Sequence, residues 1–210
     1  MKYSFELKLD WLRTMARFAS REEARYILNG VLVEVGPARQ IVLAATNGRT
    51  LAAFSDQGNL HFVPEWQFVF PNELIGAIPV NLRTLRMTLM IDCCDHEEKG
   101  GEMIKVAFGD VTASMRPIEG SYPRWRCVLP DPIPTTFNAA FLSANMKMLG
   151  EYFSAAAELI GHDTLTITGD EAIYVRGQAN SPRSGEFIGT MLPTRTPGAL
   201  KKLPLWAQEK

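Results

Sequence analysis

The sequence predicts an α+β fold assembled from repeats of one small unit. Three observations support this prediction. A strand–helix–three-strand order (βαβββ) recurs three times, strands within the repeats alternate apolar and polar residues, and a proline-rich linker precedes the third repeat. Each unit of about 60 residues is too thin to bury its own apolar face, so the units are expected to assemble edge to edge.

The first unit begins with a strand-like segment, Tyr3–Leu7. The following segment, Leu9–Ala19, carries apolar residues at helical spacing and predicts an amphipathic helix. Val31–Val35, Ile41–Ala45 and Thr50–Phe54 are apolar or alternating and predict three strands.

The second unit begins at Trp66–Phe70, which predicts its first strand. A short helix is expected over Asn72–Ile78, because Pro79 interrupts it. Strict alternation of apolar and polar residues predicts the next strand. The strands that complete this unit are expected at Leu85–Asp92, Met103–Phe108 and Val111–Met115.

The third unit is expected to open with a strand at Thr135–Phe137, followed by a helix at Ala139–Leu149 and a possible second helix at Glu151–Ile160. Its strands are predicted at Thr164–Thr168, Ala172–Arg176 and Glu186–Leu192.

Prolines divide the chain into domains. Pro130, Pro132 and Pro134 predict a stiff, extended linker. We therefore expect a complete two-unit domain over residues 1–130, a linker over 131–136, a half domain over 137–195 and a tail over 196–210.

The composition bounds the class of protein. Hydrophobic residues make up 46% and charged residues 21% of the 210 residues, which is typical of a folded domain. No apolar run approaches the roughly 18 residues of a membrane-spanning helix. The amino-terminal segment lacks a signal-peptide core, and Cys93, Cys94 and Cys127 form no disulfide framework, so we expect a cytoplasmic protein.

Several motifs are similar to those of a known family. The segments Arg25–Gly30 (RYILNG) and Ala45–Ala52 (ATNGRTLA) resemble an RYxLNG strand and a TDGHRLA turn in the middle domain of the DNA sliding clamp, the beta subunit of bacterial DNA polymerase III. Phe108–Asp110 and Glu119–Pro130 (EGSYPRWRCVLP) resemble the end of that domain. Similarities to the last clamp domain are found at Phe137–Asn138 and at Met191–Arg195 (MLPTR).

The resemblance implies a DNA clamp fold, with antiparallel sheets outside and helices on the inner face. It covers the middle domain and the second half of the last domain, as in a shortened clamp-like protein. Two departures stand out. Asn47 replaces an Asp of the turn, and the terminal MPMR becomes Leu-Pro-Thr-Arg. Three units per chain imply a homo-oligomer, a dimer or a tetramer, in which third units of different chains pair to complete a domain.

The resemblance also implies a face for double-stranded DNA, bound without sequence specificity. Arg13, Arg17 and Arg21 recur at helical spacing away from the apolar stripe, and such residues contact phosphates without reading bases. Since the formal net charge is −1, topological retention in a ring would have to replace high affinity. Alternatively, these are solvated arginines of an ordinary amphipathic helix. The candidates from the other two units are Arg83, Arg86 and Lys147.

A second implied site is an apolar pocket that captures short peptides of polymerases and other partners. Its leucines and valine supply apolar walls, and its glycine permits close backbone approach. The alternative is that these apolar residues belong to the core. The matching positions are Leu28, Thr46, Gly48, Arg49, Leu51, Pro123, Val128, Leu192 and Pro193.

The tail carries a further motif. Leu203, Leu205 and Trp206, within Lys-Leu-Pro-Leu-Trp, resemble the clamp-binding pentapeptide Gln-Leu-x-Leu-Phe. We hypothesise that this tail docks in a clamp pocket. Alternatively, Leu205 and Trp206 cover an exposed sheet edge.

An enzymatic function is not expected, and neither is a cofactor or a metal. Cys93, Cys94 and His96 form a weak metal-binding pattern without a fourth ligand at suitable spacing. No phosphate-binding glycine loop or nucleophile elbow is present. Two hypotheses remain: a sliding clamp-like processivity factor or partner-binding platform in DNA replication or repair, and a clamp-derived interaction protein of phage, prophage or plasmid type that binds replication proteins or a host clamp without encircling DNA.

Overall fold

The computed structural model describes residues 2–36, 40–57, 66–78, 86–92, 103–108, 111–129, 146–161, 166–168, 172–178 and 185–192. The elements follow the predicted order of three successive units. The first unit contains β1 (Lys2–Lys8), α1 (Leu9–Ala16), the 3-10 helix η1 (Glu23–Leu28), β2 (Gly30–Val35), β3 (Ile41–Thr46) and β4 (Thr50–Asp56). The second contains β5 (Trp66–Pro71), α2 (Asn72–Ala77), β6 (Arg86–Asp92), β7 (Met103–Phe108), β8 (Val111–Met115) and the 3-10 helix η3 (Trp125–Val128). The third contains α3 (Met146–Ile160), β9 (Thr166–Thr168), β10 (Ile173–Gln178) and β11 (Glu186–Met191).

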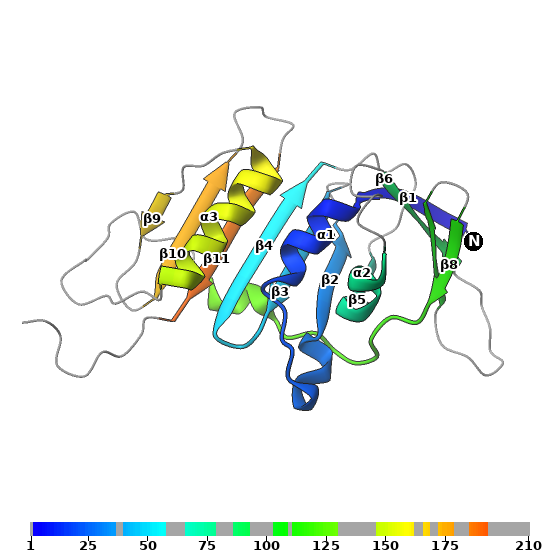
Figure 1. Ribbon diagram of the computed structural model, residues 1–210, viewed down its shortest axis with the longest axis horizontal. Helices are drawn as coiled ribbons and strands as arrows, with labels where there is room; N and C mark the ends of the chain where they lie inside the picture. Colours follow the sequence, from blue (N-terminus) through cyan, green and yellow to red (C-terminus); the bar gives the residue numbers. More distant parts are fainter. Residues whose placement is uncertain are drawn as a thin grey trace, which may run out of the picture.

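The strands form two antiparallel sheets, in the orders β1-β6-β7-β8 and β5-β2-β3-β4-β11-β10-β9 (Figure 1). The first strand of each of the first two units pairs with the other unit, because β1 lies beside β6 and β5 lies beside β2. This exchange interlocks the two units. The third unit extends the larger sheet through pairing of β11 with β4.

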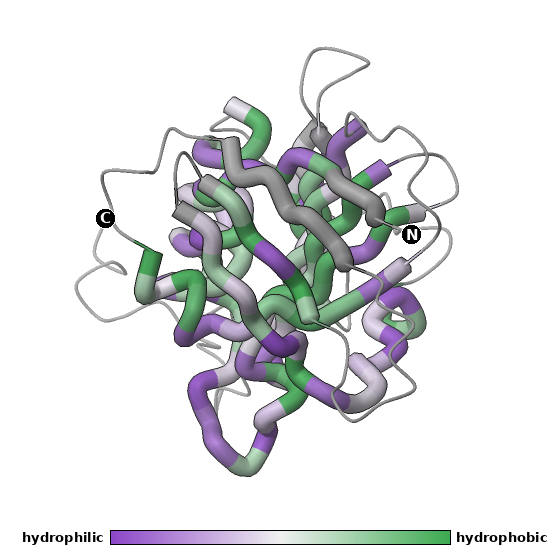
Figure 2. Tube along the Cα trace, turned by 90° about the vertical axis from the view of Figure 1, so that its right-hand side faces the viewer, coloured by the Kyte–Doolittle hydropathy of each residue, from purple (hydrophilic) through white to green (hydrophobic). Residues whose placement is uncertain are grey.

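The helices cover one face of the seven-stranded sheet. In Figure 1, α1 and α3 lie in front of this sheet, and both helices contact its strands. Alternation along β2 explains the two faces, since Val31 and Val33 pack into the core beneath the helices while Leu32 packs into a separate cluster on the opposite face. The segment 116–129 crosses that opposite face and buries Trp125 against it. Figure 2 shows hydrophobic stretches toward the middle of the molecule and hydrophilic stretches along peripheral turns.

The seam between β4 and β11 joins the first unit to the third. Tyr152 of α3 is fully buried, and its hydroxyl lies 2.9 Å from the carbonyl oxygen of Leu51 and 2.7 Å from that of Thr190. Leu51 and Thr190 are opposite each other in the register of the seam. The Tyr152 ring also packs against Phe18, with ring centroids 4.9 Å apart, and against Phe187. One helix side chain therefore fastens two strands that are far apart in the sequence.

Three local predictions were wrong. The first helix ends at Ala16 and not at Ala19, because the amides of residues 17–19 bond to carbonyl oxygens three positions earlier, which tightens the chain into a turn. In place of a strand across Arg25–Gly30, η1 ends at Leu28 and β2 starts at Gly30, where a Cβ would collide with the Phe70 backbone. In the described part of the third unit, helix α3 continues through Gly150 in place of the expected division after Leu149; residues 139–145 of the first expected helix lie outside the described residues.

Two predicted strands are confirmed, whereas other predicted segments lie outside the described residues. The strands at Met103–Phe108 and Val111–Met115 have the expected limits. The predicted strand Thr135–Phe137, the linker 131–136 and the tail 196–210 lie outside the described residues. In the described part of the chain, no helix is long and apolar enough to cross a membrane.

The seam yields a stability prediction at Gly189. A Cβ at this position would overlap the ring of Tyr152, so Gly189→Ala is expected to lower the free energy of unfolding by about 1–3 kcal/mol. Gly150→Ala is the matched control, since its Cβ meets nothing within 4 Å and alanine favours helices, which should raise stability by up to about 1 kcal/mol. Urea unfolding measures both. Equal stability of the two variants would contradict this role of the seam.

Candidate peptide-binding pocket

A tight turn between β3 and β4 forms one wall of the candidate site. The Asn47 side-chain oxygen accepts hydrogen bonds from the amides of Arg49 and Thr50, each at 2.9 Å. The Thr46 hydroxyl accepts from the Gly48 amide at 3.0 Å and donates to the Thr50 carbonyl at 2.7 Å. Gly48 has a φ of 84°, which glycine adopts without strain. The turn is therefore held by two short polar side chains and one glycine.

Arg25 of η1 buttresses this turn from outside. Its guanidinium donates to the Asn47 carbonyl at 2.8 Å and forms an ion pair with Glu22 at 3.1 Å. Space beside Gly48 is filled by the same guanidinium, since a Cβ there would lie 2.5 Å from Arg25 Nη1. The RYILNG segment thus supports the turn through its arginine.

The opposite wall is η3, which Trp125 anchors to the sheet. Trp125 is 8% exposed and packs with Leu51 and Ala53 on the face of the sheet opposite the helices, which we call the outer face. Arg126 lies over the Trp125 ring, 4.2 Å from its centroid, and donates to both carboxylate oxygens of Glu34, at 3.0 and 2.6 Å. The bidentate ion pair fixes the guanidinium that covers the ring.

A cavity of about 290 Å³ lies between these walls, at the outer side of the β4–β11 seam. Both the first and the third unit contribute to it, because Leu51 and Thr190 face each other across the seam. Its interior is mainly apolar, while Val128 and Leu192 at its edge are 56% and 66% exposed. The lining residues are Leu28, Thr46, Gly48, Arg49, Thr50, Leu51, Pro123, Arg124, Trp125, Val128, Ala172, Thr190 and Leu192.

The structure brings together every position of the expected pocket that it describes; Pro193 lies outside the described residues. Leu28 and Leu51 are buried as well as lining, so they belong to the core and to the cavity at once. The sequence reading missed five lining residues, because the register of β11 against β4 and the position of η3 had no signal in local patterns. These are Thr50, Arg124, Trp125, Ala172 and Thr190.

Two of the arginines expected to face DNA, Arg13 and Arg17, have protein partners. Arg13 donates to the Ile78 carbonyl at the end of α2. Nη2 of Arg17 donates to both carboxylate oxygens of Glu158 of α3, at 2.8 and 2.7 Å, and the Thr14 hydroxyl donates to the same carboxylate at 2.6 Å. These contacts join α1 to α2 and α3 and compensate the Arg17 charge.

The other expected DNA-facing residues are dispersed. Arg21 is exposed and lines a groove of about 690 Å³ together with Arg13, Arg17, Asn72 and Glu73. Of the remaining three, Arg83 lies outside the described residues, Arg86 belongs to strand β6, and Lys147 is an exposed residue of α3.

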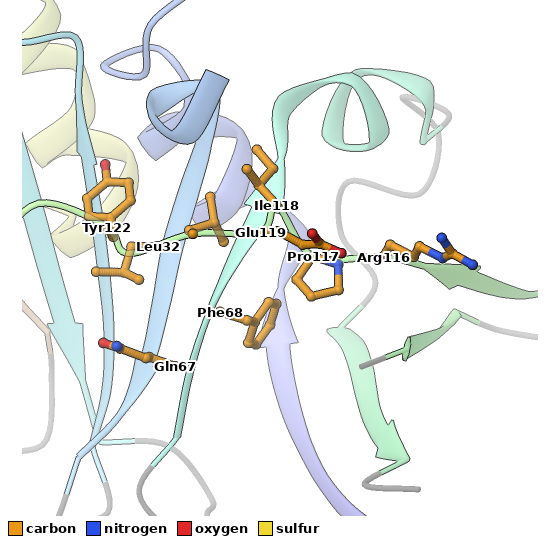
Figure 3. A pocket seen from close by; sticks show the side chains of 10 residues that line it. Leu32, Gln67, Phe68, Arg116, Pro117, Ile118, Glu119 and Tyr122 are labelled. Atoms are coloured by element: carbon orange, nitrogen blue, oxygen red, sulfur yellow. The ribbon is translucent and has the colours of Figure 1, made fainter. Parts of the chain in front are cut away.

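A second outer cavity, of about 370 Å³, lies beside the segment that leads into η3. Figure 3 shows Tyr122 and Leu32 at one end of it and Arg116 at the other, with Phe68 and Pro117 between them. Burial raises the pKa of the Tyr122 phenol, so this group is neutral at physiological pH. No residue lines both this cavity and the one at the seam, although Tyr122 of the second cavity directly precedes Pro123 of the first in the chain.

Metal-binding chemistry finds no support among the described residues, where no group of three or more His, Cys, Asp or Glu side chains is placed to hold an ion. The weak pattern of Cys93, Cys94 and His96 lies outside these residues, as do the tail residues Leu203, Leu205 and Trp206.

Comparison of the structure with solved structures defines the class of fold. It is similar to the Helicobacter pylori beta clamp solved with carprofen, with a TM-score of 0.68 and 12% identity over 92% of this chain and 67% of that one. The Bacillus subtilis DNA polymerase sliding clamp gives a TM-score of 0.51 and 17% identity, over 92% of this chain and 49% of that one. The Pseudomonas aeruginosa sliding clamp gives 0.50 and 20%, over 90% and 51%.

The fold is therefore that of the DNA sliding clamps. Within this class the chain resembles the bacterial beta clamp, and it spans about half the length of the Bacillus and Pseudomonas clamps. No protein-family profile matches the sequence, and no curated protein matches it either. The likeness establishes the architecture, while activity and partners must be argued from the residues.

The turn yields a prediction at Asn47. Asn47→Ala removes the acceptor of two backbone amides and is expected to cost about 1–2 kcal/mol of stability. Asn47→Asp keeps an oxygen acceptor in the same place, so we expect unchanged stability. Thermal unfolding of the pair measures this; a loss in Asn47→Asp as large as in Asn47→Ala would contradict the acceptor role.

Proposed function

We propose that this chain is a clamp-like, non-enzymatic, cytoplasmic platform that captures short linear peptides of DNA replication or repair proteins. The proposal rests on the cavity at the β4–β11 seam. Residues of both the first and the third unit line this cavity. A cavity of this size with an apolar lining and few polar groups suits one or two large apolar side chains of a peptide.

The exposed rim supports this proposal. Val128 and Leu192 are two of the four large hydrophobic side chains that are strongly exposed in the described part of the chain, and both line the cavity. Exposed apolar residues gathered at a concave site mark a binding surface more strongly than scattered ones do. A peptide that covers them removes their apolar area from water, at about 25 cal/mol per Å².

Ring formation around double-stranded DNA is the second part of the proposal. The edge strands β8 and β9 lie at opposite ends of the molecule (Figure 1), and each pairs on one side only among the described strands. Open edges of this kind accept strands of further copies, and closure gives a homo-oligomer, a dimer or a tetramer. In such a ring the helix-bearing face would meet DNA through Arg21, Lys147 and the pairs of Arg13 and Arg17.

One observation favours the second candidate, a clamp-derived interaction protein that binds replication proteins without encircling DNA. The Arg17 charge is compensated by Glu158, and Arg13 is engaged by the α2 terminus. Few uncompensated phosphate contacts then remain on this face, and non-specific DNA affinity depends on such contacts.

The pocket proposal predicts the effect of rim substitutions. Leu192→Ser and Val128→Ser should each weaken binding of a labelled peptide, Gln-Leu-Asp-Leu-Phe, about tenfold, because each removes an apolar contact at the rim. Leu74→Ser of α2 is the control, since Leu74 is an exposed leucine outside the pocket. Fluorescence anisotropy measures the affinities. Equal binding by all three variants, or no binding by the unaltered chain, would contradict the proposed site.

The ring proposal predicts assembly and topological retention. A closed ring is expected to show a multiple of the chain mass in native mass spectrometry, to stay on nicked circular DNA and to leave after linearisation. Retention on circular DNA should survive salt that removes ordinary phosphate contacts. A monomer that leaves both forms of DNA equally would exclude the ring and support the second candidate.

A further inference from the structure

The three units of this chain are joined by two different kinds of contact. The first is the exchange of first strands between units one and two, in which β1 pairs with β6 and β5 pairs with β2. The last residue of each donated strand lies opposite the first residue of the strand that receives it, Lys8 opposite Arg86 and Pro71 opposite Gly30. The exchange therefore joins equivalent parts of the two units.

The seam is the second kind of contact, and it also joins equivalent parts. β4 is the last strand of the first unit, and β11 is the last strand of the third. They pair antiparallel, so Thr50 at the start of β4 lies opposite Met191 at the end of β11. Antiparallel pairing of equivalent strands has the form of a two-fold contact, so neither kind of junction is head-to-tail.

Two strands keep an open edge among the described residues, one for each kind of junction. β8 and β9 lie at opposite ends of the molecule and each pairs on one side only among the described strands (Figure 1). β8 is the last strand of the second unit, so it corresponds to the strands of the seam. β9 follows the helix of the third unit, so it corresponds to β2 and β6, which receive a first strand from a neighbouring unit.

Burial separates the strands at junctions from those at open edges. β2 is buried over residues 30–33 and β4 over residues 50–54. In β8, by contrast, residues 112–114 are exposed, and no residue of β9 is buried. Ile167 at the centre of β9 is only half-buried, although it packs against the main core. The two open edges therefore leave surface exposed that the corresponding junctions bury.

The helix of the third unit adds an apolar flank beside the β9 edge. Glu158 of α3 faces α1, because its carboxylate accepts hydrogen bonds from Arg17. Helical spacing places Leu149, Phe153 and Ile160 on the opposite flank of α3, where Leu149 and Phe153 are only half-buried. In the exchange between units one and two, helices meet as well, since α1 contacts α2. The third unit thus has both components of an exchange junction and no described partner for them.

We infer that copies of this chain bind one another through equivalent surfaces: β8 pairs with β8 of one copy, and the β9 edge with the α3 flank meets the same surface of another copy. This inference rests on the ring part of the proposed function and specifies its contacts. The two kinds of contact must alternate around a closed ring, so such a ring contains an even number of chains.

Head-to-tail assembly would need a third kind of contact. It would place β8 against β9, a last strand against a strand whose counterparts receive first strands. No junction between the described strands has this form. Neither β8 (VTASM) nor β9 (TIT) carries a charged residue or a proline, which are the usual means of keeping an edge strand from pairing.

A charge placed at one surface at a time tests the inference on the full chain. Ala113 is the exposed middle residue of β8, and Ala157 is an exposed residue of α3, one turn from Phe153. In contacts between equivalent surfaces, Ala113→Arg or Ala157→Arg brings two like charges together and opposes binding. In native mass spectrometry, a tetramer is expected to fall to half its mass with either variant, and to a monomer with both substitutions in one chain.

The same measurement gives a clear contrary result. Every head-to-tail contact uses both surfaces, so either single variant would then give a monomer, which keeps the ring and overturns the inference. If the unaltered chain is a dimer, one single variant should split it and the other should leave it intact. Ser121→Arg is the control and should leave the mass unchanged, since Ser121 is exposed on the segment that crosses the outer face.

Mixing two variants tests whether the third unit meets its own equivalent. Ala157→Arg and Ala157→Glu should each lose the contact when alone. Their mixture should restore the mass of the unaltered assembly, because the Arg of one copy then lies beside the Glu of the other. Restoration also shows that the substitutions leave the fold intact, whereas a mixture that stays at the lower mass contradicts the inference.

The unaltered chain separates this inference from the proposal on which it rests. A closed ring of three chains would keep ring formation and overturn pairing through equivalent surfaces. A monomer at all concentrations would overturn both.

Discussion

The pairing of β11 with β4 is the contact on which the rest of the architecture depends. It joins residues of the first and third units into one seven-stranded sheet, and the buried Tyr152 hydroxyl spans its two strands through the carbonyls of Leu51 and Thr190. The Tyr152 ring fits against the sheet because Gly189, which lies beneath the ring, has no side chain. Aromatic packing with Phe18 adds to the apolar area buried there. Without the seam, α3 would keep its contacts with β10 and β11 but lose those with α1 and the Tyr152 contact with Leu51.

The pocket is a consequence of the same contact. Its floor comes from both strands of the seam, its walls come from the β3–β4 turn and from η3, and Arg25 and Arg126 hold these walls through Asn47 and Glu34. These groups are held by secondary-structure elements, by the Arg25–Asn47 hydrogen bond and by the bidentate Arg126–Glu34 pair, so the cavity is present without a ligand. Preformed sites lose less conformational entropy on binding, which permits useful affinity for a short peptide.

Local sequence patterns predicted the structure where interactions between neighbouring residues determine it. The predicted limits of β7 and β8 are confirmed, and motif resemblance located the Thr46–Leu51 turn within the pocket. Contacts between distant residues were beyond such patterns. Arg17 meets Glu158 across 141 positions and Arg13 meets Ile78 across 65, so helical spacing alone suggested free cations where the fold supplies partners. Trp125 and Thr190 entered the pocket for the same reason, through packing of segments that the sequence keeps apart.

The arginines of the protein differ in whether the fold supplies them with partners. On the helix-bearing face, Arg13 and Arg17 connect α1 to its neighbours, so their loss would be felt first as a loss of packing. On the outer face, Arg49 and Arg124 stabilise nothing that the described residues show, and they flank an apolar cavity. An arginine without an ion-pair partner carries little free-energy cost while water solvates it. Its attraction for an anion strengthens when a ligand excludes that water. Arg49 and Arg124 are therefore the charged groups that a ligand of the seam cavity would meet.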